Sequence, residues 1–383
     1  MTRPFAIPAM PNVHSHAFQR ALRGVGERPA PAARAADDFW SWREAMYALA
    51  ASLDPDSMYA AGLRAYAEMA AAGYGVVGEF HYVHHQPDGT PYEDPNALAV
   101  ALAEAARDAG LPIVLLPAAY HRAGWDGRDL PPTAGQRRFC DADVEAFLGR
   151  VDALRAWAAG RDGVHVGVAA HSVRAVPAAW LSAIARYAHE HDLVRHVHAH
   201  EQRREIDECL AEHGCTPIEL LERTGFLSAR TTLVHGVHVT PRDVALLAES
   251  DTVVATCPTT EGNLGDGHLP ALAYRDAGVT LAIGSDQNTI VDPFEEVREL
   301  ETLARRERQT RHALLAATGD LWGAVAAAGR RSLGLDAEAV GGIAVDLDHP
   351  RLAGVPEEDA LRAIATCAGA DVVVGPVARP PDP

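Results

Sequence analysis

Histidine and acidic residues stand at the ends of several apolar segments of this chain. His14 and His16 close the first such segment, and residues two apart on a strand share a face, so both imidazoles could reach one ion. The chain has 19 histidines, so about one His-x-His pair is expected by chance; His189 and His191 form another. Taken alone, the first pair therefore leaves both a metal site and a structural role open.

A second group of candidates lies in a later apolar segment that contains His196, His198, His200 and Glu201. Only one parity of a strand can face the centre of a closed sheet. We select His198 as a metal ligand and Glu201, just beyond the strand, as a proton carrier above the metal. His196 and His200 are interpreted as packing or surface residues.

Two further segments end in His235 and Asp286. An aspartate that follows an apolar strand needs a cation or a hydrogen-bond donor when it is buried, although capping of the next helix is an alternative role. With the histidines above, Asp286 completes a set of three ring nitrogens and one carboxylate that suits catalytic zinc with an open position for water. The same ligands accept iron or manganese, so the native metal stays open. The predicted ligands are His14, His16, His198 and Asp286.

These residues need strands to bring them together, and the chain offers eight β-rich runs that alternate with helical periodicity. The runs are 6–16, 75–85, 112–121, 165–174, 194–202, 231–238, 252–261 and 279–287. The main helix candidates are 57–72, 95–110, 141–159, 177–191, 203–213, 241–249 and 293–309. Asp94-Pro95 and Thr240-Pro241 are predicted helix starts, because proline suits the first helical position.

Eight buried strands alternating with helices favour an α/β fold, a (β/α)8 TIM-like barrel, over an open sheet. The active site of such a barrel lies at the carboxyl ends of the strands, where the unusual polar residues fall. We assign residues 1–335 to this barrel and residues 336–383 to a small accessory β region. The fold prediction includes a shortened accessory β region built from the chain ends.

Composition limits the partners of the chain. A formal net charge of −18 disfavours nucleic acid and anionic membranes as partners. The sequence contains no run of eighteen apolar residues, so we predict no membrane span. The sequence contains no lysine, which excludes a lysine Schiff base and a metal pair bridged by a modified lysine. Five scattered cysteines without a Cys-x-x-Cys motif and the absence of a secretory signal indicate a reduced, cytoplasmic protein. The sequence is compatible with a homodimer and does not determine the oligomeric state.

The segments MPNVHSHAFQRALRG, FWSWREAMY, EFHYVHH, AHSVRAV, CPTTEGNLGDG and IGSDQ add a family resemblance. The chain resembles the amidohydrolase superfamily in its aminohydrolase branch, and within it the formimidoylglutamate deiminases of histidine degradation. The likeness runs from about residue 9 to residue 310. It implies a hydrolase of linear amidines that uses one zinc ion per chain and releases ammonia from a small anionic amidine substrate.

The resemblance also implies a role for individual residues. His235 and Asp286 would deprotonate the attacking water, and Glu201 would protonate the leaving nitrogen. The substrate-binding residues it implies are Gln19, Arg43, Tyr82, His171 and Arg174. Paired arginines suit a dicarboxylate, because a guanidinium group can bind a carboxylate through two hydrogen bonds.

Other features of the resembling segments are interpreted more conservatively. Trp40, Trp42 and Tyr47 are predicted to be packing residues, and residues 263–266 a shaped loop over the site with its glycine in a tight turn. Gln287-Asn288 stands where many relatives have serine-histidine, and the short N-terminal and C-terminal parts leave the accessory region in doubt. The alternatives are another mononuclear zinc aminohydrolase, acting on a guanine-like heterocycle, and a metal-binding barrel without turnover.

Overall fold

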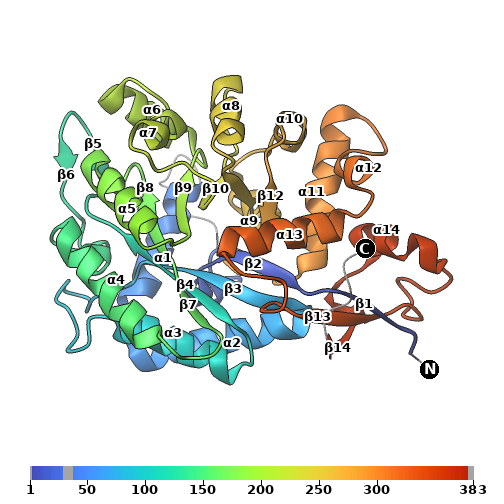
Figure 1. Ribbon diagram of the computed structural model, residues 1–383. Helices are drawn as coiled ribbons and strands as arrows, with labels where there is room; N and C mark the ends of the chain where they lie inside the picture. Colours follow the sequence, from blue (N-terminus) through green and yellow to red (C-terminus); the bar gives the residue numbers. More distant parts are fainter. Residues whose placement is uncertain (1, 29–37, 378–383) are drawn as a thin grey trace.

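The computed structural model describes residues 2–28 and 38–377 and contains a parallel sheet that curves into a barrel (Figure 1). Its strand order is β12-β11-β10-β9-β8-β4-β3-β2, with parallel neighbours throughout and the short β7 (Val164–Val166) also paired with β4. The strands are β2 (Met10–Ser15), β3 (Tyr74–His81), β4 (Ile113–Ala119), β8 (Val168–Ser172), β9 (Arg195–Ala199), β10 (Thr231–His235), β11 (Val253–Thr256) and β12 (Leu281–Ile283). The predicted barrel is confirmed.

The ring is completed where β2 meets the residues after β12. The backbone amides of Ser285 and Asp286 donate to the carbonyl of His14 at 3.1 and 2.9 Å, and the amide of His16 donates to the carbonyl of Asp286 at 2.9 Å. Asn12 reinforces the seam, since its side-chain oxygen accepts the Ser285 amide at 3.0 Å and its NH2 group donates to the Ser285 hydroxyl at 2.7 Å. The seam therefore carries three of the predicted metal ligands.

Helices follow the strands around the outside of the barrel (Figure 1). They are α1 (Phe39–Ala51), α2 (Pro55–Ala72), α3 (Ala97–Asp108), α4 (Val144–Ala158), α5 (Ala178–Glu190), α6 (Arg203–His213), α7 (Pro217–Arg223), α8 (Pro241–Glu249), α9 (Pro258–Leu264), α10 (Ala271–Ala277), α11 (Pro293–Arg308), α12 (Leu314–Thr318), α13 (Leu321–Leu333) and α14 (Ala360–Cys367), with short 3-10 turns η1 (Ala17–Leu22), η2 (Arg137–Phe139), η3 (Glu357–Asp359) and η4 (Ala370–Val372). Each of the seven helix candidates corresponds to one of them.

Two local predictions at helix starts have different outcomes. Thr240 caps α8 with Pro241 in the first turn, as predicted, and its hydroxyl accepts the Asp243 amide. The start at Asp94-Pro95 was wrong, because the Asp94 carboxylate instead accepts the Asn96 amide at 2.9 Å and delays α3 to Ala97. The run 252–261 was also too long as a strand, since α9 begins at Pro258 and converts its second half into a helix.

Both chain ends contribute to a separate antiparallel sheet on one side of the barrel (Figure 1). Its order is β1 (Pro4–Pro8), β13 (Gly342–Asp346) and β14 (Val373–Val377), which confirms an accessory β region built from the ends. A two-stranded hairpin, β5 (Gly124–Trp125) and β6 (Asp129–Leu130), projects from the loop after β4. The predicted domain boundary at residue 335 stays a prediction. Strand β1 belongs to the accessory sheet although it lies at the N-terminus, within the range 1–335 assigned to the barrel. Within the described residues, no helix has the length and apolar character needed to cross a bilayer.

Trp322 connects the barrel to the accessory sheet and provides a test of this packing. Its buried indole stacks on Phe294 at 4.5 Å between ring centroids, and its Nε1–H donates to the carbonyl of Pro8 at 2.8 Å. Trp322→Ala is expected to lower the free energy of unfolding by about 3–5 kcal/mol, because it leaves a cavity and an unpaired carbonyl. Trp322→Phe, which keeps most of the ring contact, should cost less. Urea denaturation monitored by circular dichroism measures both, and equal losses would contradict this account.

Candidate metal centre and active site

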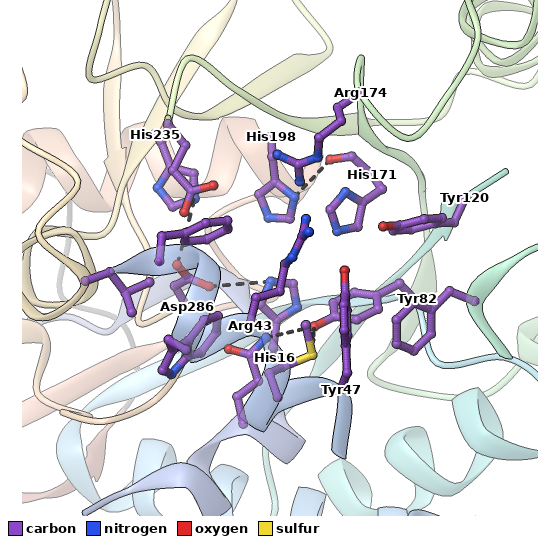
Figure 2. A pocket seen from close by; sticks show the side chains of 17 residues that line it. His16, Arg43, Tyr47, Tyr82, Tyr120, His171, Arg174, His198, His235 and Asp286 are labelled. Atoms are coloured by element: carbon purple, nitrogen blue, oxygen red, sulfur yellow. Dashed lines mark hydrogen bonds and ion pairs between the residues drawn. The ribbon is translucent and has the colours of Figure 1, made fainter. Parts of the chain in front are cut away.

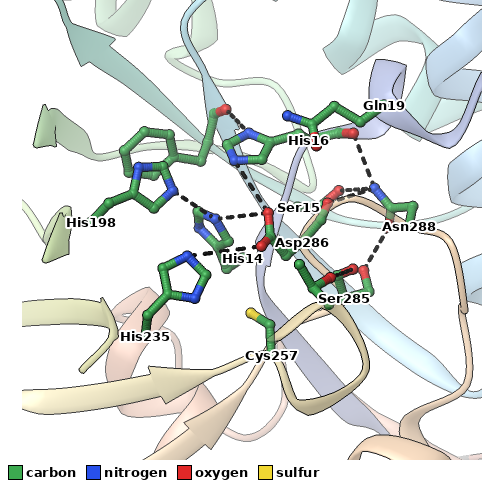
Figure 3. Close-up of polar contacts among 12 residues, drawn as sticks. His14, Ser15, His16, Gln19, His198, His235, Cys257, Ser285, Asp286 and Asn288 are labelled. Carbon is green, nitrogen blue, oxygen red and sulfur yellow. Dashed lines mark hydrogen bonds and ion pairs between the residues drawn. The ribbon is translucent and has the colours of Figure 1, made fainter. Parts of the chain in front are cut away.

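The four predicted metal ligands converge at the carboxyl end of the barrel (Figure 3). His14 lies on β2, His16 directly after it, His198 on β9 and Asp286 after β12. The Nε2 atoms of His14 and His198 are 3.0 Å apart, and Asp286 Oδ1 lies 3.5 Å from His14 Nε2 and 3.4 Å from His16 Nε2. The three histidines form a cluster whose ligand atoms all lie within 4.8 Å of one another. Asp286 joins the cluster through its contacts with His14 and His16.

Hydrogen bonds on the far side of two rings define which nitrogen faces the cluster. His16 Nδ1 is 2.8 Å from the carbonyl of Phe80, and His198 Nδ1 is 2.9 Å from the carbonyl of His171. A carbonyl only accepts, so each Nδ1 carries the proton and each Nε2 presents a lone pair to the centre. Burial lowers the pKa of His14 to about 3 and also lowers the pKa of His16 and of His198, so the rings are neutral.

This arrangement fits a bound cation. The Nε2 lone pair of His16 faces a carboxylate oxygen of Asp286, and two electron-rich atoms at this separation need a positive charge between them. Ligand distances of about 2.0–2.1 Å around tetrahedral zinc place the ligand atoms about 3.3 Å apart, close to the 3.0–3.5 Å separations observed. Gly284 leaves room for the site, because a β-carbon there would come within 2.7 Å of the His14 backbone oxygen.

The two predicted proton carriers lie beside the cluster. His235 Nε2 is 3.8 Å from Asp286 Oδ2 and 3.7 Å from Glu201 Oε1. Burial lowers the pKa of His235, but the carboxylates of Glu201, Glu261 and Asp286 outweigh it and raise the pKa to about 10. Burial, together with the charge of Asp286, raises the pKa of Glu201. Glu201 therefore holds a proton more readily than an exposed glutamate does.

The backbone at this site adopts an uncommon conformation. His235 has φ 76° and Asp286 has φ 45°, in the left-handed region that residues with a β-carbon adopt at a cost. Such strain persists only where surrounding contacts hold it, and it concentrates at functional sites. Both residues are buried; His235 pairs with Ala199 of the neighbouring strand β9, and the Asp286 amide donates to the carbonyl of His14 on β2. The strain therefore coincides with the predicted chemistry.

A cavity opens over the cluster and collects every predicted substrate contact (Figure 2). It has an empty volume of about 530 Å³, part of which is open solvent. The predicted residues on its wall are Gln19, Arg43, Tyr82, His171 and Arg174. Gln19 donates from Nε2 to the Tyr82 hydroxyl at 2.8 Å, while its side-chain oxygen has no hydrogen-bond partner among the described residues.

Two guanidinium groups in this cavity have no carboxylate partner within ion-pair distance in the described part of the chain. Figure 2 shows Arg43 and Arg174 reaching into the cavity from different sides. Both pack on the ring of Trp40, at 4.6 and 5.3 Å from its centroid. Burial and the charge of Arg174 lower the pKa of Arg43. Two cations held this close without a carboxylate between them form a ready site for an anion.

The packing interpretation of the neighbouring aromatic residues was partly wrong. Trp42 and Tyr47 line the cavity, because α1 presents the same face that carries Arg43. The predicted loop 263–266 begins too early, because α9 continues to Leu264, but the predicted tight turn at its glycine is present, with Gly265 at φ 70°. Further wall residues could not be predicted from the sequence, because they depend on how α1 and the loop after β4 pack over the site. They are Phe39, Met46, Tyr120 and Phe139, whereas Leu264 lies in the segment predicted to cover the site.

The histidines assigned to packing lie away from the cluster, as predicted. His196 Nε2 is 3.1 Å from the carbonyl of Ser332, and His200 Nδ1 is 2.7 Å from the carbonyl of His238. Asn288 has a structural role, because its NH2 group donates to the backbone oxygens of His16 and Asp286 at 3.1 and 3.0 Å. It thereby stabilises the seam that carries the ligands.

A parallel barrel with a histidine and aspartate cluster at its carboxyl end defines the metal-dependent hydrolases of this fold. Residues 5–331 match the model of the amidohydrolase family, and the chain belongs to that family. It is 41% identical over 310 residues to the formimidoylglutamate deiminase of Pseudomonas aeruginosa, a match that covers 80% of this chain and 66% of that protein.

Solved structures support the same fold. An amidohydrolase from Brucella melitensis superposes with a TM-score of 0.87 at 33% identity, covering 96% of this chain and 84% of that one. An adenosine deaminase from Xanthomonas campestris with bound zinc superposes with a TM-score of 0.81 at 24% identity, covering 98% of this chain and 79% of that one.

The matched pair His198 and His196 tests the metal centre. Both are buried on β9, but only His198 faces the cluster. His198→Ala is expected to lose zinc affinity by at least about 10- to 100-fold, because one of few ligands is removed. His196→Ala should retain zinc at the level of the unmodified protein. Zinc content by mass spectrometry and competition with a chelator provide the measurement, with thermal melts as the check on folding. Equal zinc affinity in the two variants would contradict the assignment.

Proposed function

We propose that this chain is a zinc-dependent deiminase that converts N-formimidoyl-L-glutamate and water to N-formyl-L-glutamate and ammonia, in histidine degradation. The observation that carries the proposal is the pair of guanidinium groups, Arg43 and Arg174, in the cavity over the histidine cluster without a carboxylate partner among the described residues. The likeness to the Pseudomonas aeruginosa deiminase supports it.

The proposed substrate matches the charges of the cavity. A glutamate moiety brings two carboxylates, and each guanidinium can bind one of them through paired hydrogen bonds. The protein as a whole is acidic, with a net charge of −18, so an anionic substrate depends on such local cations. We further propose that the free side-chain oxygen of Gln19 accepts an N–H of the amidine group.

We propose one zinc ion, held by His14, His16, His198 and Asp286. When bound, zinc polarises the substrate and lowers the pKa of water towards neutrality. His235 Nε2 and Asp286 Oδ2 stand 3.8 Å apart, and they can share the proton that water gives up once zinc on Asp286 offsets the carboxylate charge that raises the pKa of His235. Glu201, whose pKa is raised by burial, can deliver a proton to the nitrogen that leaves as ammonia. The C–N bond to that nitrogen breaks, and the oxygen from water becomes the carbonyl oxygen of the formyl group.

The direct test is ammonia release from N-formimidoyl-L-glutamate by the purified protein, with its zinc content quantified. We expect release that requires zinc and is abolished in Glu201→Gln. A purine panel with guanine and adenosine serves as the comparison, because a heterocycle offers no carboxylate to the two arginines. Turnover of a purine without turnover of the amidine would contradict the proposal, and so would zinc-loaded protein that acts on neither.

The arginines provide a second prediction. Arg43→Met and Arg174→Met are each expected to raise KM for the dicarboxylate by about 10- to 100-fold or more, because each removes a charged hydrogen-bond partner. Arg204→Met is the matched control. Arg204 packs on the same Trp40 ring at 4.5 Å, but it is exposed, pairs with Glu208 at 2.7 Å and does not line the cavity. Steady-state kinetics should show a nearly unchanged KM for the control, and a KM that rises equally in all three variants would refute the assignment.

A further inference from the structure

The ring of His235 is held by a residue that the proposed reaction does not use. Its Nδ1 atom lies 3.3 Å from Oε1 of Glu261, the fourth residue of α9. The backbone of the same turn is fixed separately, since the Gly236 amide donates to the carbonyl of Ala199 at 3.0 Å and the Tyr274 hydroxyl donates to the carbonyl of Gly236 at 2.6 Å. The side chain of His235 therefore depends on Glu261 for its orientation.

Glu261 is itself firmly anchored. It is 3% exposed, its Oε1 accepts the Cys257 amide at 2.9 Å, and its Oε2 accepts the Thr256 hydroxyl at 2.8 Å. These contacts connect the carboxylate to the end of β11 and to the first turn of α9. A carboxylate fixed in this way offers only acceptor atoms to the imidazole. His235 Nδ1 must then be the donor in the contact.

This contact decides which atom of His235 faces the reaction. With Nδ1 donating to Glu261, the Nε2 atom is directed towards Asp286 Oδ2 and Glu201 Oε1, at 3.8 and 3.7 Å. A ring turned over by loss of the contact would present carbon or the wrong nitrogen to the cavity. Carboxylates that fix the tautomer and angle of a catalytic histidine act in this manner in other enzymes.

We propose that Glu261 is a positioning residue that holds His235 with Nε2 directed at the reacting water. The inference rests on the proposed function, because it assigns His235 a part in proton transfer. Among the described residues, Glu261 belongs neither to the cavity lining nor to the metal cluster, and its contact with the cavity wall is the one with His235. Its removal should therefore affect the chemical step and not substrate binding.

The structure supplies a matched control in Glu296. This second buried carboxylate also stabilises the first turn of α9, because it accepts the Thr259 amide at 3.0 Å and the Thr259 hydroxyl. Glu296 makes no contact with His235 in the described residues. A purely structural role of Glu261 in α9 would thus be reproduced by Glu296→Gln.

The experiment compares Glu261→Gln, Glu261→Ala and Glu296→Gln in the zinc-loaded enzyme. We expect kcat to fall by about 10- to 100-fold in Glu261→Ala. The fall should be smaller in Glu261→Gln, because the amide oxygen can still accept the hydrogen bond. In both variants KM should stay within about threefold of its value in the unmodified enzyme. Glu296→Gln should keep kcat within about threefold, whatever its thermal stability. Protein labelled with 15N-histidine should show the hydrogen-bonded Nδ1 proton of His235 in NMR spectra of the unmodified enzyme and Glu296→Gln, and not in Glu261→Ala.

The outcomes separate this inference from the proposed function. If the unmodified enzyme releases no ammonia from the amidine, the proposed function fails, while the Nδ1 proton signal still tests the contact itself. If the unmodified enzyme is active but the Glu261 and Glu296 variants lose kcat equally, the positioning role is overturned. Loss of zinc confined to the Glu261 variants would also overturn it, because Glu261 would then act through the metal ligands.

Discussion

The backbone seam between β2 and the residues after β12 is the constraint on which the rest of the site depends. The same three hydrogen bonds that join the two ends of the sheet fix the positions of His14, His16 and Asp286. Closure of the barrel at this seam brings these three side chains together, and β9, on the opposite side of the barrel, contributes His198. Folding energy and ligand geometry are thus provided by the same contacts, and Asn12 and Asn288 reinforce both.

The electrostatics of the cavity follow from this arrangement. Burial keeps the histidines of the cluster neutral, and the acidic groups Glu201 and Asp286 gather on the side of His235. The cations lie on the outer side of the cavity, where Trp40 holds Arg43 and Arg174. A substrate with an electrophilic carbon at one end and carboxylates at the other matches this separation of charge, because each end meets groups of the complementary character.

The parts predictable from the sequence were those set by periodicity and by the rule that barrel sites lie at strand ends. That rule located His198 and Asp286, which stand where buried strands end. Strand parity does not separate His198 from His196, because residues two apart share a face; His196 lies nearer the start of β9, where its Nε2 is 3.1 Å from the carbonyl of Ser332. Substrate contacts such as Arg43 were predicted from the family resemblance alone. The local sequence of α1 does not indicate whether this helix covers the carboxyl or the amino end of the barrel strands. Trp42 and Tyr47 were missed as wall residues for the same reason. Glu261 was hidden in a segment interpreted as strand, since a single proline at position 258 decides where that strand becomes helix.

The most direct test of this account is zinc K-edge X-ray absorption on the purified protein. The account predicts only nitrogen and oxygen neighbours at about 2.0–2.1 Å, with the outer-shell pattern of imidazole rings. Cys257 lies close to this site (Figure 3), so the measurement discriminates sharply. A sulfur neighbour at about 2.3 Å, or a second metal in the outer shell, would contradict a single ion held by three histidines and one aspartate.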